Sequence, residues 1–340
     1  MKKVGEDGAV NRFKARLVYD HRGKGNEEED NYSPVANKVS LRIFLAAVAG
    51  NRWEMVQADI KTAFLNAENP GLEYVKLPRE VVEDDSQRVR VLKKALYGLQ
   101  RAPKMWHQTF ANWIIEAGFM QNQHDPCLFM HSSKQQMLII YVDDILMAAG
   151  TTNLLKEMSN ALTSRFKSRV LGEPAYFLGM NLMYQKDIGR VLLTQRTYID
   201  AVVTKFQMQL AIPKTLPLAP GTMLTKDMGE ERQKPTDYGS LVGALLFIAV
   251  STRPDVSFAV GMWTRFVSKP SVVHWNAALN LLTYLKGTKE KGIQLGGSGE
   301  EKDIVAYADS DWGSDTDDRV SVSGGVVFWG ASILSRFSRK

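Results

Sequence analysis

Two adjacent aspartates, Asp143 and Asp144, lie at the tip of an apolar hairpin pattern that runs from Met137 to Met147. The segments on both sides are rich in β-branched and large apolar residues, so they predict two neighbouring buried strands. An acidic pair on such a rigid support is suited to binding a cation. Asp is also a common turn residue, and for the pair taken alone a simple turn is the better interpretation.

A third aspartate, Asp59, changes that interpretation. It ends a strand-like run that begins at Trp53, and the residues after it suit the start of a helix. Three carboxylates close together raise one another's pKa unless divalent cations are bound. Two metal ions about 3.5–4 Å apart, held by such hard oxygen ligands, activate an attacking hydroxyl and stabilise a leaving oxygen. The three acids therefore predict nucleotidyl transfer with two divalent metal ions.

The surrounding sequence predicts elements that would position these acids. Apolar residues recur at helical spacing after Ser40, which suits an N-cap, and strand character returns at Trp53. Further strands are expected at 13–18, 72–77, 176–184, 190–193 and 304–308. Further helices are expected at 106–117, 153–166, 198–206, 241–250, 256–267 and 275–284. The pattern is that of helices packed on a sheet, then a helical region, then a glycine-rich linker at 296–299 before a new strand.

Eight ordered sequence blocks place the acids in a known context. They are Phe13-Lys-Ala-Arg-Leu-Val18, Gln57-Ala-Asp-Ile-Lys-Thr-Ala-Phe-Leu-Asn66, Leu96-Tyr-Gly-Leu-Gln-Arg-Ala-Pro-Lys-Met-Trp106, Tyr141-Val-Asp-Asp144, Phe177-Leu-Gly-Met-Asn-Leu182, Ser251-Thr-Arg-Pro-Asp255, Tyr284-Leu-Lys-Gly-Thr288 and Ala308-Asp-Ser-Asp-Trp312. In order and spacing these blocks resemble the reverse transcriptase of copia-type (pseudoviral) LTR retrotransposons over nearly the whole chain. A lone Tyr-x-Asp-Asp would be weak evidence, whereas eight ordered blocks are specific.

The resemblance implies an α+β fold of the polymerase right-hand type, followed by the first strands of an incomplete ribonuclease H-like domain. Fingers and palm would occupy residues 1–185, a thumb or connection-like helical region 186–295, and the ribonuclease H-like segment 300–340. The implied activity is that of an RNA-directed DNA polymerase, which adds dNTPs to a primer 3′-OH on an RNA or DNA template. The implied setting is a Pol polyprotein, whose other segments are candidate partners.

Carried over residue by residue, the resemblance assigns catalysis and metal binding to the three acids. Asp59 and Asp143 would hold two Mg²⁺ ions, for which Mn²⁺ is the substitute, with Asp144 secondary. Phe64 matches the aromatic steric gate that crowds a ribose 2′-hydroxyl, and a core aromatic on a helix is its alternative interpretation.

Other matches concern the nucleotide, the template and the primer. Triphosphate oxygens would meet the backbone amides of the expected helix start, namely Ile60, Lys61, Thr62 and Ala63. The basic residues that clamp the triphosphate match Lys14 and Arg16, which alone are equally well explained as surface charges. The block that contacts the template base and nucleotide matches Tyr97, Gly98, Gln100, Arg101 and Pro103. Residues 177–182 resemble the primer grip, and hydrophobic core is the alternative there.

Composition and short motifs narrow the function classes. The 340 residues are 44% hydrophobic and 24% charged, as in globular proteins, and the net charge of +6 suits a polyanionic partner without establishing one. The single cysteine, Cys127, excludes an intramolecular disulfide and a multi-thiolate zinc site, and His124 beside it lacks a second ligand pair. Walker, nucleophile-elbow and dinucleotide motifs are absent from the sequence, so hydrolase and dehydrogenase functions have no support.

The sequence also predicts where the protein resides. Its first residues lack the apolar core of a signal peptide, and the longest apolar stretch, 241–250, is too short for a membrane span. We expect an intracellular, cytoplasmic protein of a virus-like particle that is neither secreted nor membrane-bound, with a nuclear stage left open.

Two departures from the family pattern suggest an alternative function. Asp309 stands in the place of the first ribonuclease H metal ligand, but the sequence ends at Lys340, before the family's further acidic ligands. We therefore expect no ribonuclease H activity. The upstream fingers strand and the usual fingers-tip sequence are also missing, so the alternative is an inactive retrotransposon remnant that keeps the fold and weak nucleic-acid binding.

Overall fold

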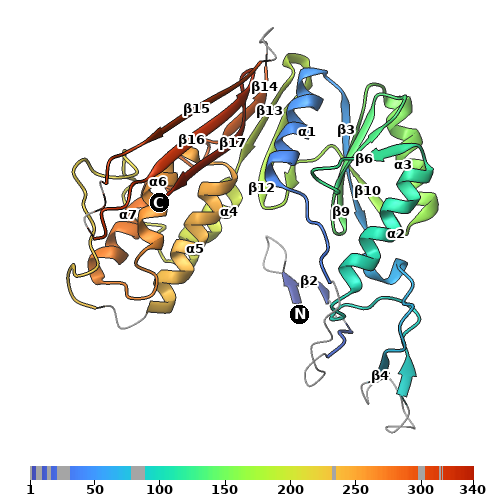
Figure 1. The fold of residues 1–340 in the computed structure, drawn as a ribbon, viewed down its shortest axis with the longest axis horizontal. Helices are drawn as coiled ribbons and strands as arrows, with labels where there is room; N and C mark the ends of the chain where they lie inside the picture. The colour runs from blue at the N-terminus through green and yellow to red at the C-terminus, as the bar shows by residue number, and fades with distance from the viewer. Residues whose placement is uncertain are drawn as a thin grey trace. The chain divides into compact units, whose positions relative to one another are not determined.

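The computed structural model describes residues 2–4, 10–13, 17–20, 31–77, 89–231, 235–297, 303–313, 315 and 317–340 (Figure 1). The chain is a mixed α and β protein with two compact units. The first unit comprises residues 1–37 and 56–172, and the second comprises residues 38–55 and 173–340. The division into fingers, palm and thumb concerns functional roles and stays a prediction.

The first unit is built on a six-stranded sheet with the order β10-β3-β9-β8-β7-β6. Its strands are β3 (Glu54–Ile60), β6 (Phe119–Gln121), β7 (Leu128–His131), β8 (Gln136–Tyr141), β9 (Asp144–Ala149) and β10 (Ser168–Gly172). The antiparallel β8–β9 hairpin is central to the sheet and nearly every residue in it is buried, which explains why its sequence is continuously apolar.

Two helices, α2 (Ala102–Glu116) and α3 (Thr152–Arg165), cover one face of this sheet (Figure 1). On α2, buried apolar residues recur every four positions at Ala102, Trp106, Phe110 and Ile114. They share one core with alternate residues of β8 and β9, such as Ile140 and Ile145. The hairpin is therefore fixed both by its neighbouring strands and by helices above it.

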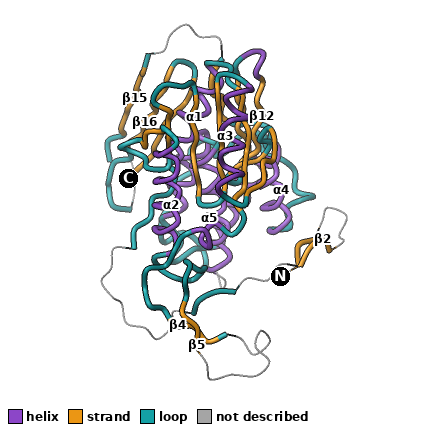
Figure 2. Tube along the Cα trace, turned by 90° about the vertical axis from the view of Figure 1, so that its right-hand side faces the viewer, coloured by secondary structure: helices purple, strands orange, loops and turns teal. Residues whose placement is uncertain are grey.

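Shorter strands form two ribbons outside this sheet. Strand β1 (Lys2–Val4) pairs with β2 (Val10–Phe13). Strand β4 (Tyr74–Lys76) pairs with β5 (Val89–Val91), and Figure 2 shows these two strands side by side.

The second unit combines two sheets with helices. One sheet has the order β11-β12-β13-β14, with strands Tyr176–Phe177, Met180–Gln185, Arg190–Thr194 and Ile293–Gly296. The other has the order β15-β16-β17, with strands Ile304–Ser310, Ser323–Trp329 and Ser332–Arg339, drawn in red in Figure 1. The helices are α1 (Lys38–Gly50), α4 (Arg196–Lys205), α5 (Pro235–Ser251), α6 (Ser257–Thr264) and α7 (Val272–Gly287). Helices α4 to α7 enclose a core of their own, and α1 packs against β13, β14 and β17.

Several sequence expectations about local structure need correction. Helix α1 begins at Lys38, so Ser40 lies inside its first turn and is not the N-cap. The expected helix after Asp59 is only a four-residue 3-10 helix, η1 (Ala63–Asn66), because Thr62 takes a left-handed conformation with φ 53°. The strand expected at 13–18 corresponds to β2, which ends at Phe13; residues 14–16 lie outside the described part of the chain.

The expected strand at 176–184 is divided into β11 and β12 by a turn at Leu178 and Gly179, both of which have positive φ. The helix expected at 256–267 is shorter: a 3-10 turn, η3 (Pro254–Val256), precedes α6, which ends at Thr264. Among the helices of the described residues, none combines the length and apolar character needed to cross a membrane.

Candidate active site

The two adjacent aspartates lie at the tip of the β8–β9 hairpin: Asp143 in its two-residue loop and Asp144 directly after it. Tyr141 pairs with Asp144, so the loop itself consists of Val142 and Asp143, and Asp144 is the first residue of β9. The backbone N–H of Ile60 donates to the Asp143 carbonyl at 2.8 Å. This bond joins the hairpin tip to the end of β3, where Asp59 lies.

The electrostatics of Asp144 show that the three acids interact. Partial burial raises the pKa of the Asp144 carboxyl, and the charges of Asp143 and Asp59 raise it further, against a hydrogen bond from Gln57 that lowers it. Like charges have this effect only when they lie close together. The sheet therefore brings together the three carboxylates that the sequence singled out.

These carboxylates suit a hard divalent cation in chemistry, although their present side-chain positions are not those of a closed metal site. Within the described residues, no set of three or more His, Cys, Asp or Glu side chains is grouped tightly enough to hold a metal ion. Carboxylate oxygens are the ligands that Mg²⁺ prefers, and a cation would relieve the repulsion that raises the pKa of Asp144. The backbones of β3 and the hairpin tip are joined by the hydrogen bond from Ile60 to Asp143, so the three acids share one end of the sheet.

Phe64 and Tyr97, two further candidate residues, are in contact with each other. Their ring centroids lie 4.6 Å apart at an interplanar angle of 50°. Phe64 is half-buried and packs against the core of the first unit. Phe64 is therefore partly a core residue, in line with its alternative interpretation. Its role as a steric gate stays a prediction.

The turn that carries Tyr97 has a structural reason for its glycine. Gly98 has φ 96°, and a Cβ atom there would lie 2.2 Å from the backbone oxygen of Tyr19. The Tyr19 N–H donates to the Tyr97 carbonyl at 2.7 Å, so two chain segments touch at this point. Nearby, the exposed Gln100 accepts a hydrogen bond from Asn31 at 3.2 Å.

Two of the four amides expected to bind a triphosphate already have other partners. The Ile60 N–H donates to Asp143, as described, and the Lys61 N–H donates to the Lys167 carbonyl at 2.9 Å. Strand pairing thus continues through Lys61, where a helix start was expected. The phosphate-binding roles of Ile60, Lys61, Thr62 and Ala63 stay predictions.

The remaining sequence candidates are distributed as follows. Lys14 and Arg16 lie outside the described residues. Pro103 lies in the first turn of α2, and Arg101 forms an ion pair with Glu73. In the block 177–182, Phe177, Met180 and Leu182 are buried, as the hydrophobic-core alternative requires.

The His124 and Cys127 pair has an ordinary structural explanation. Burial raises the pKa of the Cys127 thiol to about 12, with a further contribution from Asp125. Asp125 accepts hydrogen bonds from the backbone N–H groups of Cys127 and Asn37, so it shapes a loop.

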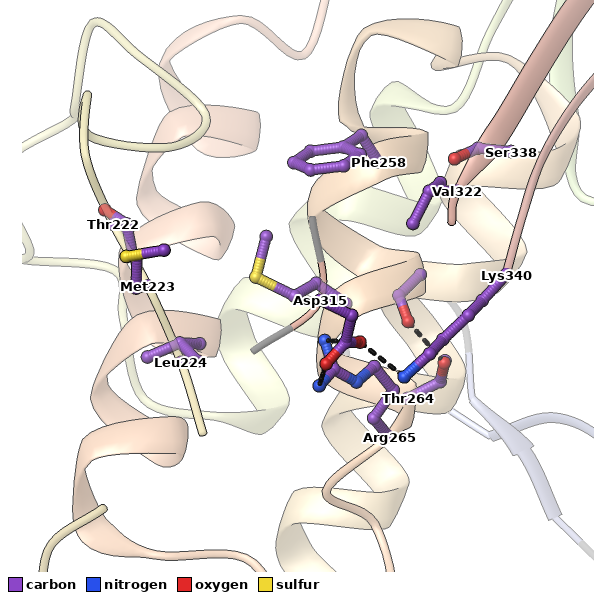
Figure 3. Close-up of a pocket in the computed structure, with 12 residues that line it drawn as sticks. Thr222, Met223, Leu224, Phe258, Thr264, Arg265, Asp315, Val322, Ser338 and Lys340 are labelled. Carbon is purple, nitrogen blue, oxygen red and sulfur yellow. Dashed lines mark hydrogen bonds and ion pairs between the residues drawn. The ribbon is translucent and has the colours of Figure 1, made fainter. Parts of the chain in front are cut away.

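Asp309 and a cavity that contains an ion-pair cluster both belong to the second unit. Asp309 is exposed on β15 opposite Gly324. A cavity of about 380 Å³ lies among Leu224, Phe258 and neighbouring residues, and Arg265 and Lys340 converge on Asp315 in its wall (Figure 3). Burial acts to raise the pKa of Asp315, but the hydrogen bond from Lys340 and the charge of Arg265 lower it. Asp315 is thus paired with both cations, and none of the three catalytic candidates lines the cavity.

Sequence reasoning missed one residue that contacts the acidic turn. The indole Nε1 of Trp106, on α2, donates to the Val142 carbonyl at 2.7 Å. Trp106 is the last residue of the sequence block that begins at Leu96, so the sequence did single out its position. Its spacing on the helix, however, indicates only a buried aromatic residue and not a hydrogen bond to the acidic turn.

Comparison with known proteins gives the class of the chain. A family model described as reverse transcriptase (RNA-dependent DNA polymerase) matches residues 1–220, and the chain belongs to this family. The family expected from the sequence blocks is therefore confirmed.

Individual relatives narrow the resemblance further. The chain is 36% and 35% identical, over all of its length, to the retrovirus-related Pol polyproteins from transposons RE2 and RE1 of Arabidopsis thaliana. It is 32% identical, over 97% of its length, to the corresponding polyprotein from transposon TNT 1-94 of Nicotiana tabacum. The chain spans 23%, 23% and 26% of these three relatives, so it corresponds to about a quarter of each polyprotein.

Proposed function

We propose that this chain is the RNA-directed DNA polymerase of a copia-type LTR retrotransposon, adding dNTPs to the 3′-OH of a primer paired with an RNA or DNA template. The observation that carries the proposal is the hydrogen bond from the Ile60 N–H to the Asp143 carbonyl, which places the end of β3, with Asp59, against the hairpin tip that carries Asp143 and Asp144. The charges of Asp143 and Asp59 that raise the pKa of Asp144 agree with this placement. Membership of the reverse transcriptase family supports it independently.

In this proposal the acids are the ligands of two Mg²⁺ ions, with Asp59 and Asp143 holding both. When bound, the ions activate the primer hydroxyl and stabilise the leaving pyrophosphate oxygen. The chain's own residues supply position: β3 and the hairpin hold the carboxylates, and the half-buried Phe64 limits the space beside the sugar. Mn²⁺ satisfies the same oxygen ligands and is the expected substitute.

The finer architecture is part of the same proposal. Fingers and palm are assigned to 1–185, a thumb or connection region to 186–295, and a ribonuclease H-like segment to 300–340. The relatives' names support a Pol polyprotein as the setting, whose other segments are candidate partners in an intracellular particle.

Primer extension on an RNA template with Mg²⁺ and dNTPs tests the proposal, using the wild-type chain beside Asp143→Asn. The variant should bind the primer–template as the wild type does, measured by fluorescence anisotropy, but should not extend it, because the lost charge serves the metal and not the duplex. Asp187→Asn, an exposed aspartate in the second unit, is the matched control and should extend normally. Equal extension by Asp143→Asn would refute the assignment, and bound duplex without extension by the wild type would make the chain a folded remnant.

A further inference from the structure

The acidic hairpin contains a conformation that its sequence does not favour. Val142, the first of the two loop residues, has φ 57°. Two-residue hairpin loops normally place Gly, Asn or Asp at such positions, and a β-branched residue at positive φ is a real outlier that costs stability. Such a conformation persists only when the surrounding structure enforces it.

Two donors from different elements enforce it here. Trp106 Nε1 on α2 donates to the Val142 carbonyl at 2.7 Å, and the Ile60 N–H on β3 donates to the Asp143 carbonyl at 2.8 Å. Both carbonyls of the loop are thus held, one from the helix side and one from the sheet.

Trp106 is itself held rigidly. It is 2% exposed, and its ring lies 5.3 Å from that of Phe166 in an edge-on contact and 5.8 Å from that of Phe110. Its N–H therefore has a fixed direction, unlike that of a surface side chain.

The Val142 carbonyl belongs to the same planar peptide unit as the nitrogen and Cα of Asp143. Fixing that carbonyl fixes this plane, and the bond from the Ile60 N–H to the Asp143 carbonyl fixes the peptide plane on the other side of the Asp143 Cα. Together the two planes set the direction in which the Asp143 side chain leaves the backbone. We propose that Trp106 is a positioning residue for the acidic pair, holding the Val142–Asp143 peptide in the orientation from which Asp143 can bind metal. The proposal rests on the proposed polymerase function of the same site.

Trp106→Phe tests this, because it removes the N–H and keeps an aromatic ring. We expect kcat for primer extension to fall roughly 10- to 100-fold, as is usual when a group that orients a metal ligand is lost. The KM for dNTP and the Kd for primer–template should be unchanged. Trp113→Phe is the matched control, since Trp113 lies on the same helix and its ring is 5.1 Å from that of Phe166, and it should keep the wild-type kcat. Wild-type kcat in Trp106→Phe, or an equal loss in Trp113→Phe, would overturn the positioning role.

A second measurement does not depend on activity. The chain has seven tryptophans, and the indole N–H signal missing from a ¹⁵N spectrum of Trp106→Phe identifies Trp106. In the wild type that signal should exchange slowly with solvent, and Mn²⁺ should broaden it more than the signal of Trp113, with the broadening lost in Asp143→Asn. Fast exchange, or no Mn²⁺ effect, would overturn the inference even if the chain polymerises. An inactive wild type whose Trp106 signal behaves as expected would instead refute the proposed function and leave the geometry standing.

Discussion

Replacing Arg253 by methionine would remove the centre of a hydrogen-bond network in the second unit. Arg253 is 1% exposed. It donates to both carboxylate oxygens of Asp255, at 2.9 and 2.7 Å, and to the carbonyl and hydroxyl oxygens of Thr288, at 2.9 and 2.8 Å. Tyr284 also donates to Asp255, at 2.8 Å. Two separate sequence blocks, 251–255 and 284–288, are therefore one structural feature.

The expected loss of stability follows from which groups are left without a partner. Breaking a fully buried ion pair costs about 3–5 kcal/mol, because a buried charge remains. The Asp255 side chain is 37% exposed, so water can hydrate it and the cost should be lower, about 2–3 kcal/mol. For a unit of this size that corresponds to about 5–10 °C in Tm.

Urea unfolding and calorimetry of Arg253→Met measure this loss directly. Arg196→Met is the control, because Arg196 and Glu290 form an exposed pair at 3.7 Å that should contribute no more than about 1 kcal/mol. If Arg253→Met destabilises the chain no more than Arg196→Met does, the network contributes little and the reasoning is wrong.

The pH dependence gives an independent check on the same network. Burial acts to raise the pKa of Asp255, but hydrogen bonds from Arg253 and Tyr284 outweigh it and lower the pKa. A lowered native pKa contributes stability that is present above the ordinary value of 3.8 and is lost as the pH falls through the native pKa. The stability difference between wild type and Arg253→Met should therefore shrink in acid, and a difference independent of pH would contradict the ion-pair account.

Three further predictions concern the first unit. Phe64→Ala should raise ribonucleotide incorporation relative to deoxynucleotide by roughly 10-fold or more, the scale on which a pocket wall rejects one substituent; unchanged sugar selectivity in single-nucleotide insertion would exclude the gate. Asp144→Asn should stabilise the chain at pH 7 without divalent ions by about 0.5–2 kcal/mol. The pKa of Asp144 is raised in the folded chain, so the charged carboxylate destabilises the fold at pH values above that pKa. Below the ordinary value of 3.8 the carboxyl is protonated in both the folded and the unfolded chain, and the destabilisation is absent. A gain that persists in acid, measured by calorimetry, would contradict this. Gly98→Ala should cost at least about 2 kcal/mol in urea unfolding, from positive φ and the clash with Tyr19, and a neutral effect would mean that the turn relaxes freely.

The chemistry of the candidate site could be predicted from sequence because its signals are local. An apolar run with Asp143 and Asp144 inside it predicts a buried hairpin with acids at the tip, and the structure has that hairpin. The position of Trp106 could not be predicted, because its hydrogen bond joins residues 36 positions apart and depends on how α2 docks. Helical spacing identifies Trp106 as buried and says nothing about where its N–H points.

The parts of the fold that were not predicted either have sequence patterns too short to recognise or have local preferences that pairing within the sheet outweighs. Strands β6 and β7 are three and four residues long, too short for alternation to stand out. The residues after Asp59 have a helix-like composition, but the left-handed Thr62 and the strand bond of Lys61 restrict the helix to one turn. In both cases pairing within the sheet decided the outcome over local preference.

The left-handed conformation of Val142 connects the packing of α2 with the position of the acidic pair. A glycine at position 142 would fit φ 57° without cost, yet it would leave the neighbouring acid free to turn. With valine, the left-handed conformation exists only while α2 and β3 hold the two loop carbonyls. The direction of Asp143 then depends on the packing of α2 against the hairpin, so a change in the aromatic core can alter the acids without touching them. Strain at this loop is thus the physical link between the core of the first unit and the geometry of its carboxylates.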